Sequence, residues 1–248
     1  MRLPFQLWFV VAIFFASCPQ AQVRAQSQPE WHDFLQENPN KDTRFGLRRS
    51  MLFVDRCKEI FRNENVPESL VWIALIESSF RPFAVSRTGA VGLYQFKRET
   101  AVHFGLRVQP GRDERTFPFL SAQACARYLH YLYEKFQDWD LVLAAYNLGE
   151  GALRRTMQRT STRNWIQVKV YIRKETQEFV PKVRAAAEIG EQFLKTGQEM
   201  CCKLVKVNSG DTLYRLSKEY DCAVEELMRM NGLEHHGLQV GQSIIVPF

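Results

Sequence analysis

The spacing of apolar residues changes near residue 200, and this change divides the chain into two domains of different classes. Before it, apolar residues recur at helical intervals, for example at positions 52, 53, 57, 60 and 61. The same period predicts helices over 50–64, 67–78, 121–136, 141–147 and 181–194. Alternating strand patterns are nearly absent before residue 203. We therefore expect an all-α domain over residues 26–195.

The last 46 residues have a different pattern. Apolar residues alternate over 203–207 and again over 243–247, which predicts two strands. Between them, a Ser-Gly-Asp-Thr turn precedes predicted helices at 213–220 and 223–231. Residues 203–248 should thus form a small α+β domain in the order βααβ. Residues 196–202 interrupt the helical pattern and are predicted to be a linker.

The N-terminus has the parts of an export signal. A basic residue is followed by a ten-residue apolar core at 7–16 and then by small residues, so residues 1–25 are predicted to be a signal peptide. Cleavage after Ala25 would start the mature chain at Gln26. A lipoprotein signal ending at Cys18 and an uncleaved anchor are the alternatives. In each case the body works outside the cytoplasm, in the periplasm or cell envelope, with possible membrane attachment through the N-terminus.

The charge balance places the basic residues in the first domain. The chain has 33 basic and 27 acidic residues, whereas residues 203–248 contain five basic and six acidic ones. This excess suggests an acidic or polymeric partner without identifying it. Histidines are scattered and there is no Cys-x-x-Cys pair, so we expect no metal and no cofactor. We also expect a monomer and no nucleic-acid partner.

The cysteines leave two interpretations open. Export permits disulfides, so Cys57 and Cys125 could bridge two helices and Cys222 could pair with Cys201 or Cys202. Buried structural thiols are the simpler interpretation.

Glu77 is the carboxylate most suited to chemistry. It follows Leu70 and Ile73 at i+7 and i+4, so it shares their apolar helix face, and it lies near the helix C-terminus. Both conditions disfavour the ionised form and raise the pKa. A carboxyl that stays protonated near neutral pH can act as the general acid in glycosidic cleavage. A partly exposed residue at the end of an amphipathic helix is the plainer alternative.

Three segments together resemble a known family. They are ESSFRP followed by AVS at 77–86, GAVGLYQF at 89–96 and AAYNLGEG at 144–151. Each is similar to a signature of the bacterial lytic transglycosylases and goose-type lysozymes, family 23 of the glycoside hydrolases, and they occur in the family's order. The resemblance covers about residues 45–195 and implies a lysozyme-like fold. The layout is most similar to the membrane-bound type D members, which join this domain to LysM repeats.

The resemblance implies a role for each matching residue. Glu77 would be the sole acid and then the base. Ser86 would lie near the substrate N-acetyl group or sugar oxygen, and Gln95 would hydrogen-bond the glycan. Tyr146 would hydrogen-bond the Glu77 carboxyl and hold its rotamer, while Asn147 would contact the N-acetyl group. The structural alternatives are a turn residue at 86 and a core residue at 146.

The implied activity is non-hydrolytic cleavage of the MurNAc-β-1,4-GlcNAc bond of peptidoglycan, which leaves 1,6-anhydro-MurNAc ends. No second acid stands out beside Glu77: Asp138 and Asp140 are interpreted as solvated charges, and Glu150 is available. A lysozyme-like muramidase and a non-catalytic wall-binding protein are the alternatives. One departure is Phe179, in a segment similar to the family's Glu-Thr-x-x-Tyr-Val-Pro-Lys, where tyrosine is usual.

Aromatic side chains near these motifs could stack on sugar rings in a groove. They are Trp72, Tyr94, Phe96, Tyr128 and Tyr131. For Tyr128 and Tyr131, a position in the core is the alternative.

The C-terminal domain resembles a LysM repeat over its whole length. KVNSGDTLYRLS at 206–217 is similar to the start of the repeat, and ELMRMNGL at 226–233 and LQVGQSIIVP at 238–247 to its second half. The resemblance implies binding of N-acetylglucosamine chains between loops 210–213 and 231–238. The implied ligands are Gly210, Asp211, Thr212, Leu213, Asn231, Gly232 and Leu233. Capping of a helix is the alternative role of Asp211 and Thr212.

Overall fold

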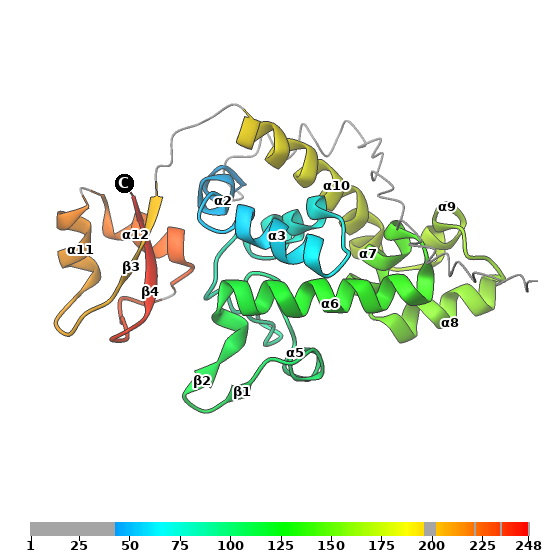
Figure 1. Cartoon of the computed structure of the whole chain (residues 1–248), viewed down its shortest axis with the longest axis horizontal. Helices are drawn as coiled ribbons and strands as arrows, with labels where there is room; N and C mark the ends of the chain where they lie inside the picture. Colours follow the sequence, from blue (N-terminus) through cyan, green and yellow to red (C-terminus); the bar gives the residue numbers. More distant parts are fainter. Residues whose placement is uncertain (1–42, 196–201, 221, 234, 248) are drawn as a thin grey trace, which may run out of the picture.

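The computed structural model describes residues 43–195, 202–220, 222–233 and 235–247, and Figure 1 shows their arrangement. In chain order the elements are α2 (Thr43–Ser50), α3 (Val54–Asn63), η2 (Glu68–Trp72), α4 (Ile73–Ser78), α5 (Arg98–His103), β1 (Val108–Gln109), β2 (Arg112–Asp113), η3 (Glu114–Thr116), α6 (Pro118–Phe136), α7 (Trp139–Leu148), α8 (Glu150–Thr160), α9 (Trp165–Val168), η4 (Lys169–Tyr171), α10 (Lys174–Lys195), β3 (Cys202–Lys206), α11 (Leu213–Glu219), α12 (Val224–Asn231) and β4 (Ser243–Pro247). The predicted signal, and the predicted linker apart from Cys202, lie outside the described residues.

The first domain is helical, as predicted, and it is built around the long helix α6. Helices α3 and α7 pack against α6, and α10 packs against α7 and η2 (Figure 1). The core includes Phe61, Trp72, Leu129 and Leu143, all inaccessible to solvent. Their burial removes large apolar surfaces from water, which is the main stabilising contribution to such a domain.

Helix α10 is longer than predicted because it continues through a proline. The sequence pattern suggested a start at Pro181, yet the helix begins at Lys174 and contains Pro181 in its interior. Proline has no amide proton to donate to the preceding turn, but packing of the helix against the core offsets this loss. Gly190 allows the close approach, since a Cβ there would lie 2.3 Å from the Trp72 ring.

The predicted helix 67–78 is in fact two elements. Pro67 precedes the 3-10 turn η2, and the α-helix α4 begins only at Ile73. The predicted helix 50–64 corresponds to α3, which begins only at Val54, because a turn separates it from α2, whose last residue is Ser50. Periodicity does not detect such interruptions, because a short turn shifts the helical phase by little.

The first domain also contains a short hairpin. The two-residue strands β1 and β2 pair antiparallel before residue 203, where a strand was not expected.

Cys57 and Cys125 are buried free thiols, so they do not form the disulfide that export would permit. Burial raises the pKa of Cys57 to about 12, which makes it an unreactive core residue.

The second domain has the predicted βααβ order. Strands β3 and β4 pair antiparallel with Leu204 opposite Ile245, and α11 and α12 pack beside them (Figure 1). Its own core is small, with six buried apolar side chains among the residues that the structure describes. Met230 and Ile245 instead belong to the core of the first domain. The small domain therefore gains buried surface by docking on the large one.

No helix in the described part of the chain combines the length and the apolar character needed to cross a bilayer.

Candidate active site

Glu77 lies in the last turn of α4 and is half-buried. Burial raises the pKa of its carboxyl to about 8, and the negative charge of Glu175 adds to the rise. The predicted direction of the shift is therefore confirmed, with desolvation as its main cause. None of the described residues forms a hydrogen bond with this carboxyl. The group is thus neutral at pH 7 and able to donate its proton to a ligand.

The turn after Glu77 has an unusual backbone. Ser79 and Phe80 both adopt left-handed conformations, with φ of 51° and 55°. Each costs about 1 kcal/mol for a residue with a Cβ atom. Surrounding contacts hold the turn: Phe80 is fully buried against Trp72, and Arg49 Nε donates to the carbonyl of Ser79 at 2.7 Å. The last turn of α4 therefore has a fixed position.

The loop that follows carries the second motif, and it is tied directly to α4. The hydroxyl of Ser78 donates to the carbonyl of Leu93 at 2.8 Å. Gly92 has φ of 87°, and a Cβ there would lie 1.9 Å from the carbonyl oxygen of Arg115. Only glycine fits such an approach. This glycine therefore lets the loop pack against the segment that contains Arg115.

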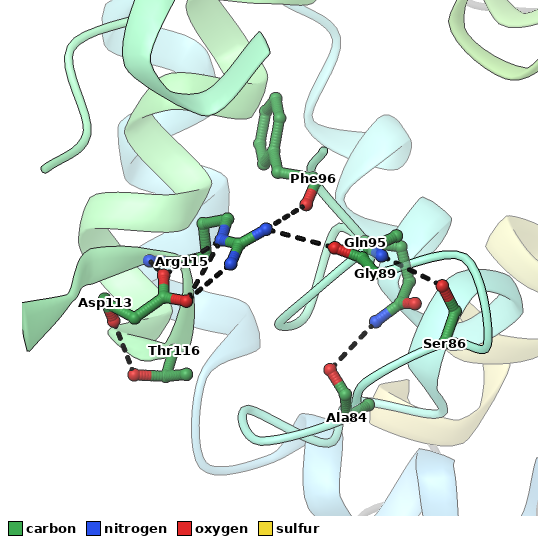
Figure 2. Close-up of polar contacts among 9 residues, drawn as sticks. Ala84, Ser86, Gly89, Gln95, Phe96, Asp113, Arg115 and Thr116 are labelled. Carbon is green, nitrogen blue, oxygen red and sulfur yellow. Dashed lines mark hydrogen bonds and ion pairs between the residues drawn. The ribbon is translucent and has the colours of Figure 1, made fainter. Parts of the chain in front are cut away.

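Arg115 holds the loop in place (Figure 2). Its guanidinium, almost fully buried, donates to the carbonyls of Gly89 and Phe96 at 3.2 and 3.1 Å. Asp113 binds the same guanidinium, with Nη2 to Oδ2 at 2.6 Å. Burial opposes the charge on Asp113, but the Arg115 hydrogen bonds outweigh it and lower the pKa of the carboxyl. Sequence reasoning missed this pair, because nothing in the local pattern shows that these charges turn inward.

Ser86 and Gln95 lie on this loop and are half-buried. The Ser86 hydroxyl accepts a hydrogen bond from the amide of Ala90 at 2.9 Å, so Ser86 does stabilise a turn (Figure 2). Gln95 donates from Nε2 to the carbonyls of Gly92 and Ala84, at 2.9 and 3.2 Å. In the described chain no group donates to its Oε1, which leaves an acceptor for a ligand. Their contacts with glycan stay predictions.

Tyr146 lies close to Glu77, but its predicted hydrogen bond is wrong. The hydroxyl donates to the backbone carbonyl of Tyr94 at 2.5 Å rather than to the Glu77 carboxyl. Burial chiefly raises the pKa of Tyr146, with smaller contributions from Cys125 and Glu77. The ring stacks on Phe179, with centroids 6.2 Å apart and planes 10° apart. Tyr146 therefore joins the α7 motif to the loop beside Gln95.

Asn147 follows Tyr146 on α7, and residues at the start of α10 hold it in place. The hydroxyl of Thr176 donates to Asn147 Oδ1 at 2.6 Å, and Arg173 Nη2 donates to the Asn147 carbonyl at 2.8 Å. The side-chain amide nitrogen has no acceptor among the described residues, so it can donate to a ligand carbonyl. Thr176 was not predicted as a site residue, although it belongs to the segment in which Phe179 replaces tyrosine.

The other acidic residues are engaged elsewhere. Asp138 caps α7 through the amide of Leu141, and Asp140 pairs with Arg184 in a half-buried position, so the interpretation of Asp140 as solvated is wrong. Burial raises the pKa of Asp140 despite this arginine. Burial also opposes the charge on Glu150, but hydrogen bonds from Lys135 and Tyr131 prevail and lower its pKa.

The predicted aromatic groove is only partly present. Trp72, Tyr94 and Phe96 are buried in the core, so they do not offer faces to a sugar. Tyr128 and Tyr131 remain half-buried. Aromatic residues near a site are more often core than surface, and no spacing rule separates the two.

Comparison with known proteins agrees with this geometry. The transglycosylase SLT domain family matches residues 58–168, which include Glu77, the loop and the α7 motif. The LysM domain family matches residues 205–247. The chain carries a transglycosylase SLT domain followed by a LysM domain. The predicted family and fold class are thereby confirmed.

Named relatives extend the match. The chain is 27% identical over 178 residues to membrane-bound lytic murein transglycosylase D of Escherichia coli K12, covering 69% of this chain and 38% of that protein. It is 46% identical over 83 residues to peptidoglycan transglycosylase gp16 of Escherichia phage T7, covering 33% of this chain and 6% of that protein. The crystal structure of the 70 kDa soluble lytic transglycosylase from Escherichia coli matches in fold, with a TM-score of 0.52 and 22% identity over 69% of this chain and 31% of that one.

The LysM domain uses several of its predicted ligands for its own fold. Asn231 is fully buried, and its side chain bonds three times to backbone: Nδ2 to the carbonyls of Leu227 and Ile245, and Oδ1 from the amide of Ile245. Leu213 is 2% exposed in the small core. Neither side chain is available to a glycan, so the predicted glycan contacts of these two residues stay a prediction for their backbone groups alone. The sequence pattern alone did not distinguish these two buried residues from the loop residues next to them.

The remaining LysM residues differ in availability. Thr212 caps α11 through the amide of Arg215, as the alternative proposed, and the Asp211 carboxylate accepts from the amide of Asn208. Gly232 faces the SLT domain, since a Cβ there would lie 3.0 Å from Cδ of Arg81. Gly210 is exposed and Leu233 is half-buried, so both stay candidate ligands.

Proposed function

We propose that this chain is a peptidoglycan lytic transglycosylase that cleaves the MurNAc-β-1,4-GlcNAc bond without water. The SLT domain match and the names of the relatives support the reaction class. The observation that carries the proposal is Glu77, a carboxyl with a pKa of about 8 and no hydrogen-bonded partner in the described chain. Such a group holds the proton that the leaving oxygen needs at neutral pH.

The chemistry follows from a single carboxyl. Glu77 donates its proton to the bridging oxygen, and the bond from that oxygen to C1 of MurNAc breaks. The N-acetyl oxygen of the same sugar stabilises the cation at C1 in place of a second carboxylate. The Glu77 carboxylate then takes the proton of the C6 hydroxyl, whose oxygen attacks C1 and closes the 1,6-anhydro ring. Protons balance, and Glu77 ends protonated.

The neighbouring residues would position the sugar. The Asn147 amide, held by Thr176, is suited to donate to the N-acetyl carbonyl, and Gln95 Oε1 to accept from a glycan hydroxyl. Ser86 supports the loop and borders the same region. Fixed donors and acceptors lose little entropy on binding, so they favour the reactive geometry. Tyr146 acts as a positioning residue through Tyr94.

The LysM domain would bind glycan weakly and raise the concentration of strands near the SLT domain. We propose that the protein is exported and works as a monomer in the periplasm or cell envelope. The predicted signal peptide over residues 1–25 supports export, and a lipoprotein signal ending at Cys18, which would attach the chain to the membrane, is the alternative. Mass analysis of the mature N-terminus tests this: a chain starting at Gln26 is expected, whereas an acylated Cys18 would show membrane attachment.

Mass spectrometry of digested peptidoglycan tests the reaction. We expect disaccharide products lighter by one water than lysozyme products, because the ring closes internally. Products with a reducing-end MurNAc would establish the muramidase alternative. Glu77→Gln should abolish cleavage and leave peptidoglycan pull-down intact, while the matched control Glu134→Gln, at an exposed position on α6, should keep full activity. Cleavage by the Glu77→Gln chain would support the non-catalytic role of this residue and overturn the scheme.

A further inference from the structure

The segment from α8 to η4 presents a basic surface that the proposed reaction does not use. Between Gly151 and Lys174 the chain has seven basic residues and no acidic one. Arg155, Arg159 and Arg163 are exposed. No carboxylate within the described ranges pairs with any of these three guanidinium groups. An unneutralised cluster of this kind attracts anions.

Apolar side chains lie on the same segment and point outward. Trp165 and Val168 fix α9 to the core, with exposed fractions of 8% and 0%. On the outer side, Ile166, Val170 and Tyr171 are 57–63% exposed. Three large apolar side chains exposed within six residues form an apolar patch of the kind that marks an interaction surface.

The basic and apolar residues meet at one place. Arg159, Val170 and Tyr171 line a surface hollow of about 690 Å³ together with Thr162. Thr162 also borders a second hollow of about 430 Å³, which Arg163 and Lys135 line. We define the α8–η4 face as Arg159, Val170 and Tyr171, which line one hollow, together with the exposed residues Arg155, Arg163 and Ile166 of the same segment.

We propose that the α8–η4 face docks on the anionic headgroups of a lipid bilayer. Arginines pair with lipid phosphates, while aliphatic and tyrosine side chains enter the interfacial region, where amphipathic rings are favoured. An acidic peptide would pair with the arginines but would leave the three apolar side chains uncovered. The charge and the apolar surface together therefore favour a bilayer.

The position of this face fits a protein working between a membrane and a polymer. In Figure 1, α8 and α9 lie at one end of the molecule and the LysM domain lies at the other. A chain docked through the α8–η4 face would thus hold its LysM domain away from the bilayer. This contact is separate from any N-terminal lipid, and it does not depend on the chemistry at Glu77.

Vesicle binding by the mature chain from Gln26, which lacks the Cys18 lipid site, tests the proposal. We expect cosedimentation with phosphatidylcholine vesicles that contain about a third phosphatidylglycerol, and release by salt. Arg155→Glu/Arg159→Glu should weaken binding at least about tenfold, since each surface charge contributes several-fold. Ile166→Ser/Val170→Ser should weaken it severalfold without changing the salt dependence.

The matched control reverses two exposed lysines of the LysM domain, Lys206→Glu/Lys218→Glu, and changes the net charge equally. It should bind within about twofold of the wild type. Equal losses in both charge variants would show a general charge effect and overturn the proposal. Unchanged vesicle binding by the arginine variant, with weaker peptidoglycan pull-down, would assign the face to acidic stem peptides and also overturn it.

Discussion

The C-terminal ends of α4 and α12 each carry a polar side chain, yet the two ends serve different purposes. At the end of α4, Glu77 is half-buried with no hydrogen-bonded partner in the described chain, and desolvation raises the pKa of its carboxyl. At the end of α12, Asn231 is fully buried and forms three hydrogen bonds to backbone. A polar group left unsatisfied is available for a ligand, whereas a fully bonded one stabilises the fold.

The two ends also meet in space. Gly232, which follows Asn231, faces Arg81, four residues after Glu77. Met230 of α12 packs into the core of the SLT domain. Family motifs mark both ends with similar strength, so only the partners of each side chain distinguish a reactive group from a structural one. The following predictions test that distinction, from the largest expected effect to the smallest.

Glu77→Gln should stabilise the protein above neutral pH. The folded-state pKa of Glu77 is raised, so its stabilising contribution is complete below pH 4.5 and is lost as the pH rises through about 8. The wild type should therefore lose up to about 5 kcal/mol relative to the variant between these limits. Urea unfolding of both chains at acidic and alkaline pH measures the difference, and parallel pH profiles would contradict the burial of this carboxyl.

Arg115→Met should reduce both stability and activity. It removes the hydrogen bonds that fix the loop carrying Ser86 and Gln95, and it leaves Asp113 without its partner. We expect a loss of about 3 kcal/mol in the free energy of unfolding. Arg62→Met is the matched control, because both partners of its pair with Glu68 are exposed, and it should cost under about 1 kcal/mol. Equal effects of the two substitutions would refute the special role of Arg115.

Asn231→Ala should destabilise the LysM domain without affecting cleavage of short soluble glycans. It leaves the amide and carbonyl of Ile245 without their side-chain partner, at a cost of about 2 kcal/mol. Differential scanning calorimetry measures the loss, and exposed Asn208→Ala serves as control. A variant that unfolds like the wild type but no longer binds glycan would restore Asn231 as a ligand.

Ser86→Ala should have the smallest effect on the fold. Its hydroxyl accepts from the amide of Ala90 and shares an exposed hydrogen bond with the hydroxyl of Thr88, so the expected loss is about 1 kcal/mol. Ser86→Thr retains the hydroxyl and should recover most of that loss in urea unfolding. If threonine failed to recover stability, the turn would not depend on this bond.

The sequence predicted the residues better than their contacts. The helical spacing of apolar residues predicted α6 and α7, and their alternation predicted β3 and β4. The position of Glu77 on an apolar helix face predicted the direction of its pKa shift. These features depend on neighbours in the chain. They can be predicted because local burial patterns repeat with the period of the element.

What could not be predicted depends on groups far apart in the chain. Pro181 lies inside α10 because packing outweighs a local rule. The hydroxyl of Tyr146 bonds to a carbonyl 52 residues away, and Arg115 reaches Gly89 across 26. Backbone acceptors have no sequence signature, so motifs identified Tyr146 without its true partner.

The pKa of Glu77 is the most direct test of the account. A ¹³C NMR titration of the carboxyl, assigned by comparison with Glu77→Gln, should show a midpoint near pH 8 in the folded protein. A midpoint between about 4 and 5, the range of an ordinary glutamate, would show that the group is ionised at neutral pH and would contradict its role as proton donor.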